Sequence, residues 1–186
     1  MTKLEIRTIM KALKSKLLES QIHMCGDTIS NQLFQTSAYI QCKQLFCYVS
    51  FNQEVITTTI IKMALSQKKN VAVPKIIGDE MKFYFINSLE DLKPGILGIL
   101  EPITLEEAIP RMDERNLVVV PGLAFDLNRN RIGYGKGYYD GYFLKYEGIP
   151  MKKIALAYDF QVLDILPVED HDKQIDQIIT QTRIII

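Results

Sequence analysis

One glycine-rich stretch holds the residue types best suited to chemistry. Residues 129–143 read RNRIGYGKGYYDGYF, and alternating glycines stand there among basic side chains: Gly133, Gly135, Gly137, Arg129, Arg131 and Lys136. Glycines at this spacing allow positive φ and let backbone amides approach a ligand, and amides at the start of a helix bind anions. Because the basic side chains add positive charge, the stretch predicts a site for phosphate groups.

The glycine spacing by itself leaves an alternative open. Neither GxxxxGK[ST] nor GxGxxG occurs here, so the stretch is neither a Walker loop nor a dinucleotide-binding fingerprint. The same glycines also fit a tight strand-to-helix turn that binds nothing.

Aromatic residues and one carboxylate follow the glycines. Three aromatic side chains recur at helical spacing, which predicts a face buried in the core: Tyr142, Phe143 and Tyr146. Tyr138 and Tyr139 differ, because they lie in the first predicted turn, next to the glycines. Asp140 in that turn suits the helix dipole and could equally hold a hard cation beside a second carboxylate.

The amino-terminal segment predicts one amphipathic helix over residues 2–22, with leucine and isoleucine at steps of three to five. Lys3 and Arg7 lie four residues apart, so they share one face near the start of this helix. From the residues alone, these two charges fit a solvated face.

Elements that could position these residues alternate along the chain. The pattern predicts strands at 44–51, 70–76, 81–86, 116–122, 152–159 and 178–186, helices at 28–40, 54–69 and 138–147, and a surface excursion at 87–103. Such alternation indicates an α/β protein: a three-layer α/β/α sandwich with a mostly parallel sheet, of the type shared by sugar-phosphate isomerases and CoA transferases. Ligands of such sheets bind beyond the carboxyl ends of strands, which directs attention to VSFNQE at 49–54 and to the glycine stretch.

Composition narrows the class of protein. The length of 186 residues fits a single domain, 1–186, and the balance of 22 basic against 22 acidic residues argues against nucleic acid or an anionic membrane as partner. No apolar run is long enough to cross a bilayer and no signal peptide is recognisable, so we expect a cytoplasmic protein. Cys25, Cys42 and Cys47 are odd in number and lack CxxC spacing, which predicts reduced structural thiols.

Six motifs in order resemble those of the 5-formyltetrahydrofolate cyclo-ligases, also called 5,10-methenyltetrahydrofolate synthetases. The most specific is VVVPGLAFDLNRNRIGYGKGYYD. The others are the Lys3-x-x-x-Arg7 pair, VSFNQEV, AVPKI, GILEP and LPVEDHDKQID, so the resemblance spans almost the whole chain. It implies a monomeric enzyme that uses ATP and Mg²⁺ to convert 5-formyltetrahydrofolate into 5,10-methenyltetrahydrofolate, with release of ADP and phosphate.

The resemblance also implies which residues form the site. The ATP site would be lined by Lys3, Leu4, Glu5, Ile6, Arg7, Arg131, Ile132, Gly133, Tyr134, Gly135, Lys136, Gly137, Tyr138 and Tyr139. Folate would meet Val49, Glu54, Tyr134, Gly135, Lys136, Gly137 and Tyr138, with Glu54 bonding the pterin ring. Magnesium would be held by Asp140 and Asp172, and Lys136, Arg131 and Tyr139 would serve catalysis. His171 is expected to be a plain loop residue.

Two positions depart from the commonest family pattern. Asn130 stands where glycine is frequent, although asparagine also tolerates the left-handed region, so the turn is expected to survive. Tyr134 stands where relatives often have arginine, which removes one charge from the phosphate loop. Two other classes remain open: a sugar-phosphate isomerase-like enzyme that acts without ATP, and a noncatalytic nucleotide-binding module.

Overall fold

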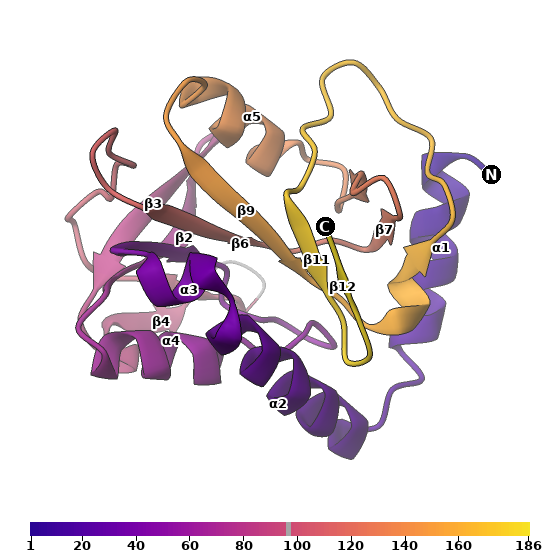
Figure 1. Cartoon of the computed structure of the whole chain (residues 1–186), viewed down its shortest axis with the longest axis horizontal. Helices are drawn as coiled ribbons and strands as arrows, with labels where there is room; N and C mark the ends of the chain where they lie inside the picture. Colours follow the sequence, from indigo (N-terminus) through magenta and orange to yellow (C-terminus); the bar gives the residue numbers. More distant parts are fainter. Residues whose placement is uncertain (96–97) are drawn as a thin grey trace.

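A seven-stranded sheet forms the centre of the molecule (Figure 1). Its strands are β1 (Gln44–Cys47), β2 (Asn70–Ile77), β3 (Glu80–Ile86), β6 (Asn116–Val120), β9 (Met151–Leu156), β11 (Gln177–Ile179) and β12 (Ile184–Ile185). In this computed structural model, which describes residues 1–95 and 98–186, the strand order is β12-β11-β9-β6-β1-β2-β3. The five inner strands pair in parallel, and β3 and β12 pair antiparallel at the two edges. The predicted mostly parallel sheet is confirmed.

Helices cover both faces of the sheet, as the strand–helix alternation predicts. They are α1 (Lys3–Lys14), α2 (Glu19–Gln35), α3 (Ser37–Gln41), α4 (Thr58–Ser66) and α5 (Tyr138–Lys145), with the 3₁₀ turns η1 (Leu89–Asp91) and η3 (Asp159–Gln161). Figure 1 shows α5 on one side of the sheet and α2, α3 and α4 on the other. Successive β1 residues follow this division, because Leu45 packs with α2 and α4 whereas Phe46 packs with α5.

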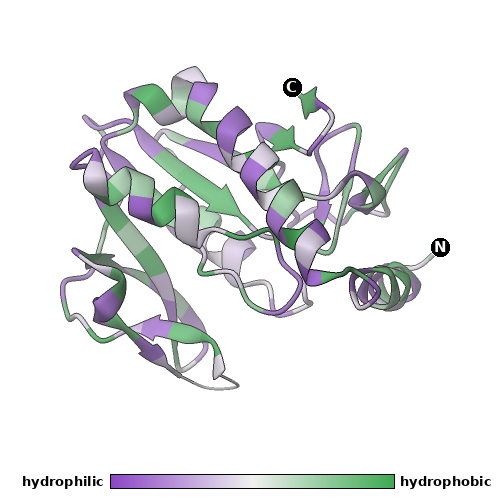
Figure 2. Ribbon diagram, turned by 90° about the horizontal axis from the view of Figure 1, so that it is seen from below, coloured by the Kyte–Doolittle hydropathy of each residue, from purple (hydrophilic) through white to green (hydrophobic). Residues whose placement is uncertain are grey.

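The single amino-terminal helix predicted over residues 2–22 is wrong. Helix α1 ends at Lys14 and α2 begins at Glu19, and Leu18 between them has an extended backbone. The two helices serve different surfaces: Ile6 and Met10 of α1 pack beside the main sheet on a separate small cluster, whereas α2 packs on the sheet itself. Figure 2 shows α1 nearly end-on beside the N-terminus, with both hydrophilic and hydrophobic residues around it.

Short elements account for the other differences from the predicted pattern. A three-stranded sheet supports α1; it consists of β10 (Val162–Leu163), β7 (Ala124–Asp126) and β8 (Arg131–Ile132), and only β7 and β8 lie between β6 and the glycines in the chain. The predicted strand at 178–186 is a hairpin of β11 and β12, closed where Thr180 and Arg183 bond each other. The excursion at 87–103 contains η1 and the pair β4 (Leu92–Pro94) and β5 (Leu100–Pro102), and its residues 96–97 lie outside the described residues.

Three cysteines are unbonded thiols, as predicted, with Cys42 and Cys47 buried and Cys25 partly buried. None of the helices in the described part of the chain combines the length and hydrophobicity that a membrane span needs.

Candidate active site

The predicted site lies where β1 and β6 end. These neighbouring strands are parallel, and Cys47 pairs with Val119 at their carboxyl ends, so the segments that follow leave from the same edge of the sheet. Glu54 of the first segment and Tyr134 of the second meet there, because the Tyr134 hydroxyl donates to Glu54 Oε1 at 2.7 Å. The structure therefore joins the two exits that the sequence singled out.

Hydrogen bonds fix the segment that carries Glu54. The Tyr158 hydroxyl donates to the Glu54 carbonyl at 3.2 Å, and the Tyr48 hydroxyl donates to the Val55 carbonyl at 3.0 Å. The second carboxylate oxygen of Glu54 accepts from the Phe51 amide at 3.0 Å. Glu54 is thus held by its backbone and by one oxygen, while its other oxygen faces the glycine segment.

Two glycines of the glycine segment adopt positive φ, a backbone conformation that favours glycine. Gly135 and Gly137 have φ of +99° and +69°, and Gly137 is the N-cap residue directly before α5. A Cβ at Gly135 would lie 3.5 Å from the Arg7 guanidinium carbon, an ordinary contact distance, so the positive φ and not the space favours glycine here. Lys136 between these glycines is exposed and makes no hydrogen bond or ion pair within the described part of the chain, which leaves its charge available.

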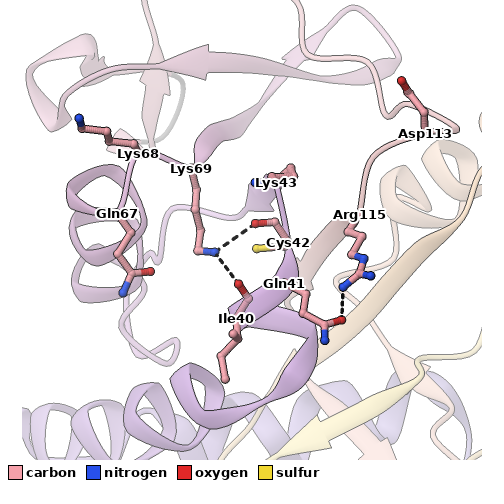
Figure 3. Close-up of a pocket in the computed structure, with 9 residues that line it drawn as sticks. All are labelled: Ile40, Gln41, Cys42, Lys43, Gln67, Lys68, Lys69, Asp113 and Arg115. Atoms are coloured by element: carbon pink, nitrogen blue, oxygen red, sulfur yellow. Dashed lines mark hydrogen bonds between the residues drawn. The ribbon is translucent and has the colours of Figure 1, made fainter.

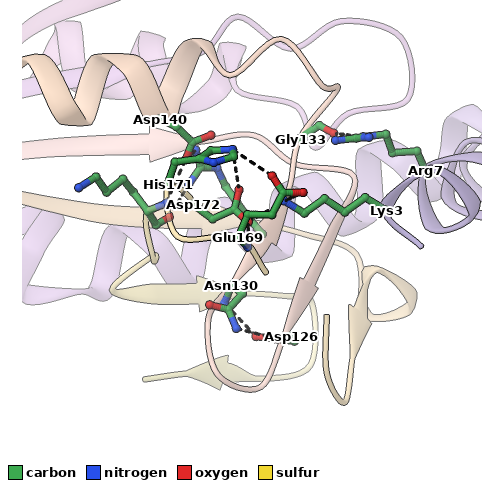
Figure 4. Close-up of polar contacts among 11 residues, drawn as sticks. Lys3, Arg7, Asp126, Asn130, Gly133, Asp140, Glu169, His171 and Asp172 are labelled. Carbon is green, nitrogen blue, oxygen red and sulfur yellow. Dashed lines mark hydrogen bonds and ion pairs between the residues drawn. The ribbon is translucent and has the colours of Figure 1, made fainter. Parts of the chain in front are cut away.

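The charged face of α1 lies against this segment, as Figure 4 shows. Arg7 Nε donates to the Gly133 carbonyl at 2.9 Å, and Lys3 Nζ contacts Asp172 at 2.7 Å and Glu169 at 3.2 Å. The prediction from the residues alone, that Lys3 and Arg7 lie on a solvated helix face, is wrong, because both side chains contact other segments. Their neighbours differ: Leu4 is exposed, Glu5 completes a capping box with Thr2, and Ile6 is buried in the core under α1. Only Lys3 and Arg7 of residues 3–7 therefore have side chains directed at the site.

The ion pair between Lys3 and Asp172 favours the charged form of both residues. Partial burial opposes charge on Asp172, but hydrogen bonds from Lys3 and from the Glu169 amide outweigh it and lower the pKa of the carboxyl. Burial likewise opposes charge on Lys3, and its bonds to Asp172 and Glu169 raise its pKa in net terms.

A second ion pair holds the other predicted metal ligand. Arg131 Nη2 donates to Asp140 Oδ1 at 2.7 Å, Lys173 donates its amide to the same oxygen at 3.0 Å, and Arg131 Nη1 donates to the Lys173 carbonyl at 2.6 Å. Arg131 is only 7% exposed, so in this structure it positions Asp140 and does not project into the glycine segment. Ile132 beside it is core.

Asp140 and Asp172 are brought to the same region by these contacts, since Lys173 follows Asp172 directly and bonds Asp140. Across residues 1–95 and 98–186 no group of three or more His, Cys, Asp or Glu side chains is arranged to hold a metal ion. His171 is an exposed loop residue whose ring lies 3.3 Å from Glu169.

The turn before the glycines differs from the expectation for Asn130. Arg129, not Asn130, adopts the left-handed conformation, with φ of +64°. Asn130 instead stabilises the turn by bonding the buried Asp126 twice, from its amide at 2.8 Å and its side chain at 2.9 Å. The turn therefore forms without a glycine at position 130, because the Asn130 side chain bonds Asp126 and stabilises it.

The predicted burial is confirmed for Tyr142 and Phe143, whereas Tyr146 is only partly buried, as Tyr138 and Tyr139 are. Tyr142 and Phe143 are buried in the core under α5, with Tyr146 and Tyr138 partly buried against it. The ring centres of Tyr139 and Phe83 lie 6.4 Å apart. The Tyr139 hydroxyl is buried and has no hydrogen-bond partner among the described residues. Burial raises the pKa of Tyr139 well above its usual value, so it remains a neutral side chain.

A narrow hollow lies beside Glu54. Its walls are Lys14, Tyr48, Glu54, Val55, Pro121, Gly122, Leu156 and Gln161, and they leave no space for a water molecule. Val49 is not part of this lining; it is 6% exposed and packs in the core, and Val55, which does line the hollow, belongs to the same core cluster. Lys14 was not predicted from the sequence, although its spacing of seven from Arg7 places both on one helical face.

Another hollow, of about 460 Å³, lies at the opposite edge of the sheet, where β1, β2 and β6 begin (Figure 3). Basic side chains line much of it, among them Lys43, Lys68, Lys69 and Arg115. No residue predicted for the site contributes to it, so the motif residues and this larger space are separate.

Comparisons with known proteins agree with the geometry. Residues 1–181 match the model of the 5-formyltetrahydrofolate cyclo-ligase family. A probable 5-formyltetrahydrofolate cyclo-ligase of Schizosaccharomyces pombe is 31% identical, over 97% of this chain and 96% of its own length, and a 5-formyltetrahydrofolate cyclo-ligase of Haemophilus influenzae is 29% identical, over 90% and 91%.

Solved structures show the same fold. The structure of Aquifex aeolicus 5,10-methenyltetrahydrofolate synthetase superposes with a TM-score of 0.85 at 30% identity, covering 99% of this chain and 92% of that one. A 5,10-methenyltetrahydrofolate synthetase from Mycoplasma pneumoniae gives 0.77 at 23% identity, covering 97% and 99%, which supports the fold. The resemblance predicted from the motifs is confirmed: the chain belongs to the 5-formyltetrahydrofolate cyclo-ligase family.

Proposed function

We propose that this chain converts 5-formyltetrahydrofolate into 5,10-methenyltetrahydrofolate, using ATP and releasing ADP and phosphate. Family membership supports the reaction. The observation that carries the proposal for the site is the 2.7 Å contact between Tyr134 and Glu54, because it joins a phosphate-type loop to the carboxylate expected to bind the pterin. A nucleotide and a folate bound to these two segments would be neighbours.

The chemistry explains why such a juxtaposition is needed. A formamide carbonyl is a weak electrophile whose oxygen is a poor leaving group, so the oxygen first attacks the γ-phosphorus of ATP and ADP departs. N10 of the folate then attacks the carbon of the resulting iminium phosphate. The carbon–oxygen bond breaks, phosphate leaves, N10 loses its proton, and the methenyl bridge remains. Phosphoryl transfer of this kind depends on positioning and charge neutralisation.

The proposed phosphate site uses residues that the structure has gathered. The amides of residues 133–137, the Lys136 ammonium and the start of α5 would receive the phosphates, with Arg7 and Lys3 of α1 beside them. Arg131 would contribute by holding Asp140, since its guanidinium is buried against that carboxylate. Tyr139 would serve as a neutral wall.

The residues fit a magnesium ion that arrives with the nucleotide. Magnesium is commonly bound by one or two carboxylates together with substrate phosphates, which agrees with two aspartates in place of a full protein cage. Asp140 and Asp172 would be those carboxylates, each already held in place by a basic residue. When bound, the ion would neutralise charge on the phosphates.

The proposed folate site beside Glu54 must widen before folate can bind. Glu54 would accept from the pterin ring, and the hollow beside it is too narrow for a water molecule, so Tyr134 has to leave Glu54 Oε1 when folate enters. Tyr134 is half-exposed, which leaves it room to move.

We further propose a single domain, residues 1–186, acting as a cytoplasmic monomer on these two small molecules. The unbonded thiols fit a reducing compartment. Sedimentation or size-exclusion measurements would give a mass near 21.4 kDa, and a dimer mass would contradict the monomer.

An omission assay tests the proposed reaction. The protein is incubated with 5-formyltetrahydrofolate, ATP and Mg²⁺, and each is left out in turn while methenyl absorbance and ADP are followed. We expect product only in the complete mixture, with one ADP formed for each methenyl product. Folded protein that forms no product would reject the proposal, and the isomerase-like and noncatalytic alternatives predict that result.

A further inference from the structure

Lys14 is a third basic residue on the inward face of α1. At about 100° per residue, Lys3, Arg7 and Lys14 fall within about 40° of arc on the helix. The rise of α1 separates Lys14 from Lys3 by about 16 Å, which carries Lys14 away from the phosphate end of the site. The same helical face therefore reaches both the glycine segment and the hollow beside Glu54.

The surroundings of Lys14 are unusual for a lysine. The residue is 6% exposed, and its Nζ lies 3.5 Å from the Tyr134 hydroxyl and 5.9 Å from the centre of that ring. No carboxylate of the described residues lies within ion-pair distance of it. A buried ammonium without a direct counter-charge costs free energy, so its presence calls for a ligand that uses it.

The groups that face Lys14 come from three other elements. Glu54 follows β1, Tyr134 belongs to the glycine segment, and Tyr48 and Gln161 complete the polar lining. Burial lowers the pKa of Lys14, and Glu54 partly restores it, whereas burial raises the pKa of both tyrosines. The hollow thus brings one amine, Lys14, and one carboxylate, Glu54, to the same space.

A pterin ring presents a matching edge. Its 2-amino group and N3–H are hydrogen-bond donors in a row with the 4-oxo group, which is an acceptor. A carboxylate satisfies the two donors, and an ammonium satisfies the acceptor. With Tyr134 displaced, Glu54 Oε1 and Lys14 Nζ are the charged groups left facing the same space.

Building on the folate site proposed above, we propose that Lys14 donates a hydrogen bond to the pterin 4-oxo group and makes the pocket specific for 4-oxo pteridines. A 4-amino group in that place is a donor, so it would face the Lys14 ammonium without an acceptor between them. The 4-amino ligand would bind more weakly, because it leaves the buried Lys14 ammonium without a hydrogen-bond acceptor.

Equilibrium binding of two ligands tests this assignment. Dissociation constants are measured by calorimetry for 5-formyltetrahydrofolate and its 4-amino-4-deoxy analogue, with wild type, Lys14→Met and Lys14→Arg. Lys11→Met is the matched control, since Lys11 is an exposed residue of the same helix. We expect wild type to bind the 4-oxo ligand more tightly than the 4-amino ligand. The ratio of the two dissociation constants should fall at least about tenfold in Lys14→Met and change little in Lys14→Arg.

The ratio of the two constants separates specificity from damage to the fold. If Lys14→Met weakens both ligands equally, or changes neither, the assignment is wrong. Should Lys14→Met not fold, Lys14→Gln provides the same comparison with a polar side chain. The outcomes also separate the two proposals: a wild type that forms methenyl product while Lys14→Met keeps the full preference overturns only the role of Lys14, whereas a wild type that binds no folate overturns both.

Discussion

Replacing Lys136 with alanine removes one positive charge from the centre of the glycine segment. The side chain is exposed and has no hydrogen bond or ion pair in the described part of the chain. Its removal should therefore change the free energy of unfolding by no more than about 0.5 kcal/mol. The flanking glycines keep the backbone geometry, because their positive φ values do not depend on Lys136.

The effect on turnover should be much larger. A preorganised charge that stabilises the transferring phosphoryl group contributes roughly 2.7 kcal/mol, which corresponds to about a hundredfold in rate. Lys136→Ala should therefore lower kcat about a hundredfold with an unchanged melting temperature. Lys136→Arg keeps the charge and should recover part of the loss.

The assay follows methenyl absorbance at saturating ATP and folate, with thermal unfolding measured on the same preparations. Lys62→Ala, at an exposed position of α4, is the matched control and should retain wild-type turnover. A kcat for Lys136→Ala within about threefold of wild type would mean that the γ-phosphate does not lie against this side chain.

Further predictions concern the carboxylates. Glu54→Gln should raise KM for folate at least about tenfold and leave KM for ATP nearly unchanged, and an equal rise in both would contradict its placement on the folate side. Asp140→Asn, which can still bond Arg131, should raise the Mg²⁺ concentration needed for half-maximal activity; an unchanged titration would leave Asp140 as a helix-start residue only. Asp172→Asn should cost about 1 kcal/mol of stability at neutral pH, where wild type keeps the ion pair with Lys3. Because the pKa of Asp172 is lowered in the fold, this stabilisation exists above the unfolded pKa and is lost as pH falls through the folded one, so urea titrations of the two proteins should converge in acid, and a constant gap would contradict the sign.

The sheet, and the meeting of the two segments that carry the candidate site, were predictable from local sequence. Continuous apolar runs such as 116–120 are typical of strands buried on both faces, and the parallel pairing of β1 with β6 then brings Glu54 and Tyr134 to one edge. The burial of Tyr142 and Phe143 followed from helical spacing in the same way.

What the sequence did not predict depends on tertiary packing. The strands β7, β8 and β10 have two or three residues each, too few to show a period, yet they form the surface on which Ile6 and Met10 pack. The first helix ends at Lys14, and this last lysine is buried beside Tyr134. Arg131 shows the same limit, because its pairing with Asp140 joins residues nine apart through a turn that sequence spacing does not describe.

The position of a bound nucleotide would show whether the glycine segment holds the phosphates of ATP. A structure of the protein with Mg²⁺ and a non-hydrolysable ATP analogue should place the β- and γ-phosphates against the amides of residues 133–137, with Lys136 and Arg7 beside them and Glu54 facing the γ-phosphate end. Phosphates bound in the basic hollow near Lys43 and Arg115, at the other edge of the sheet, would contradict the account.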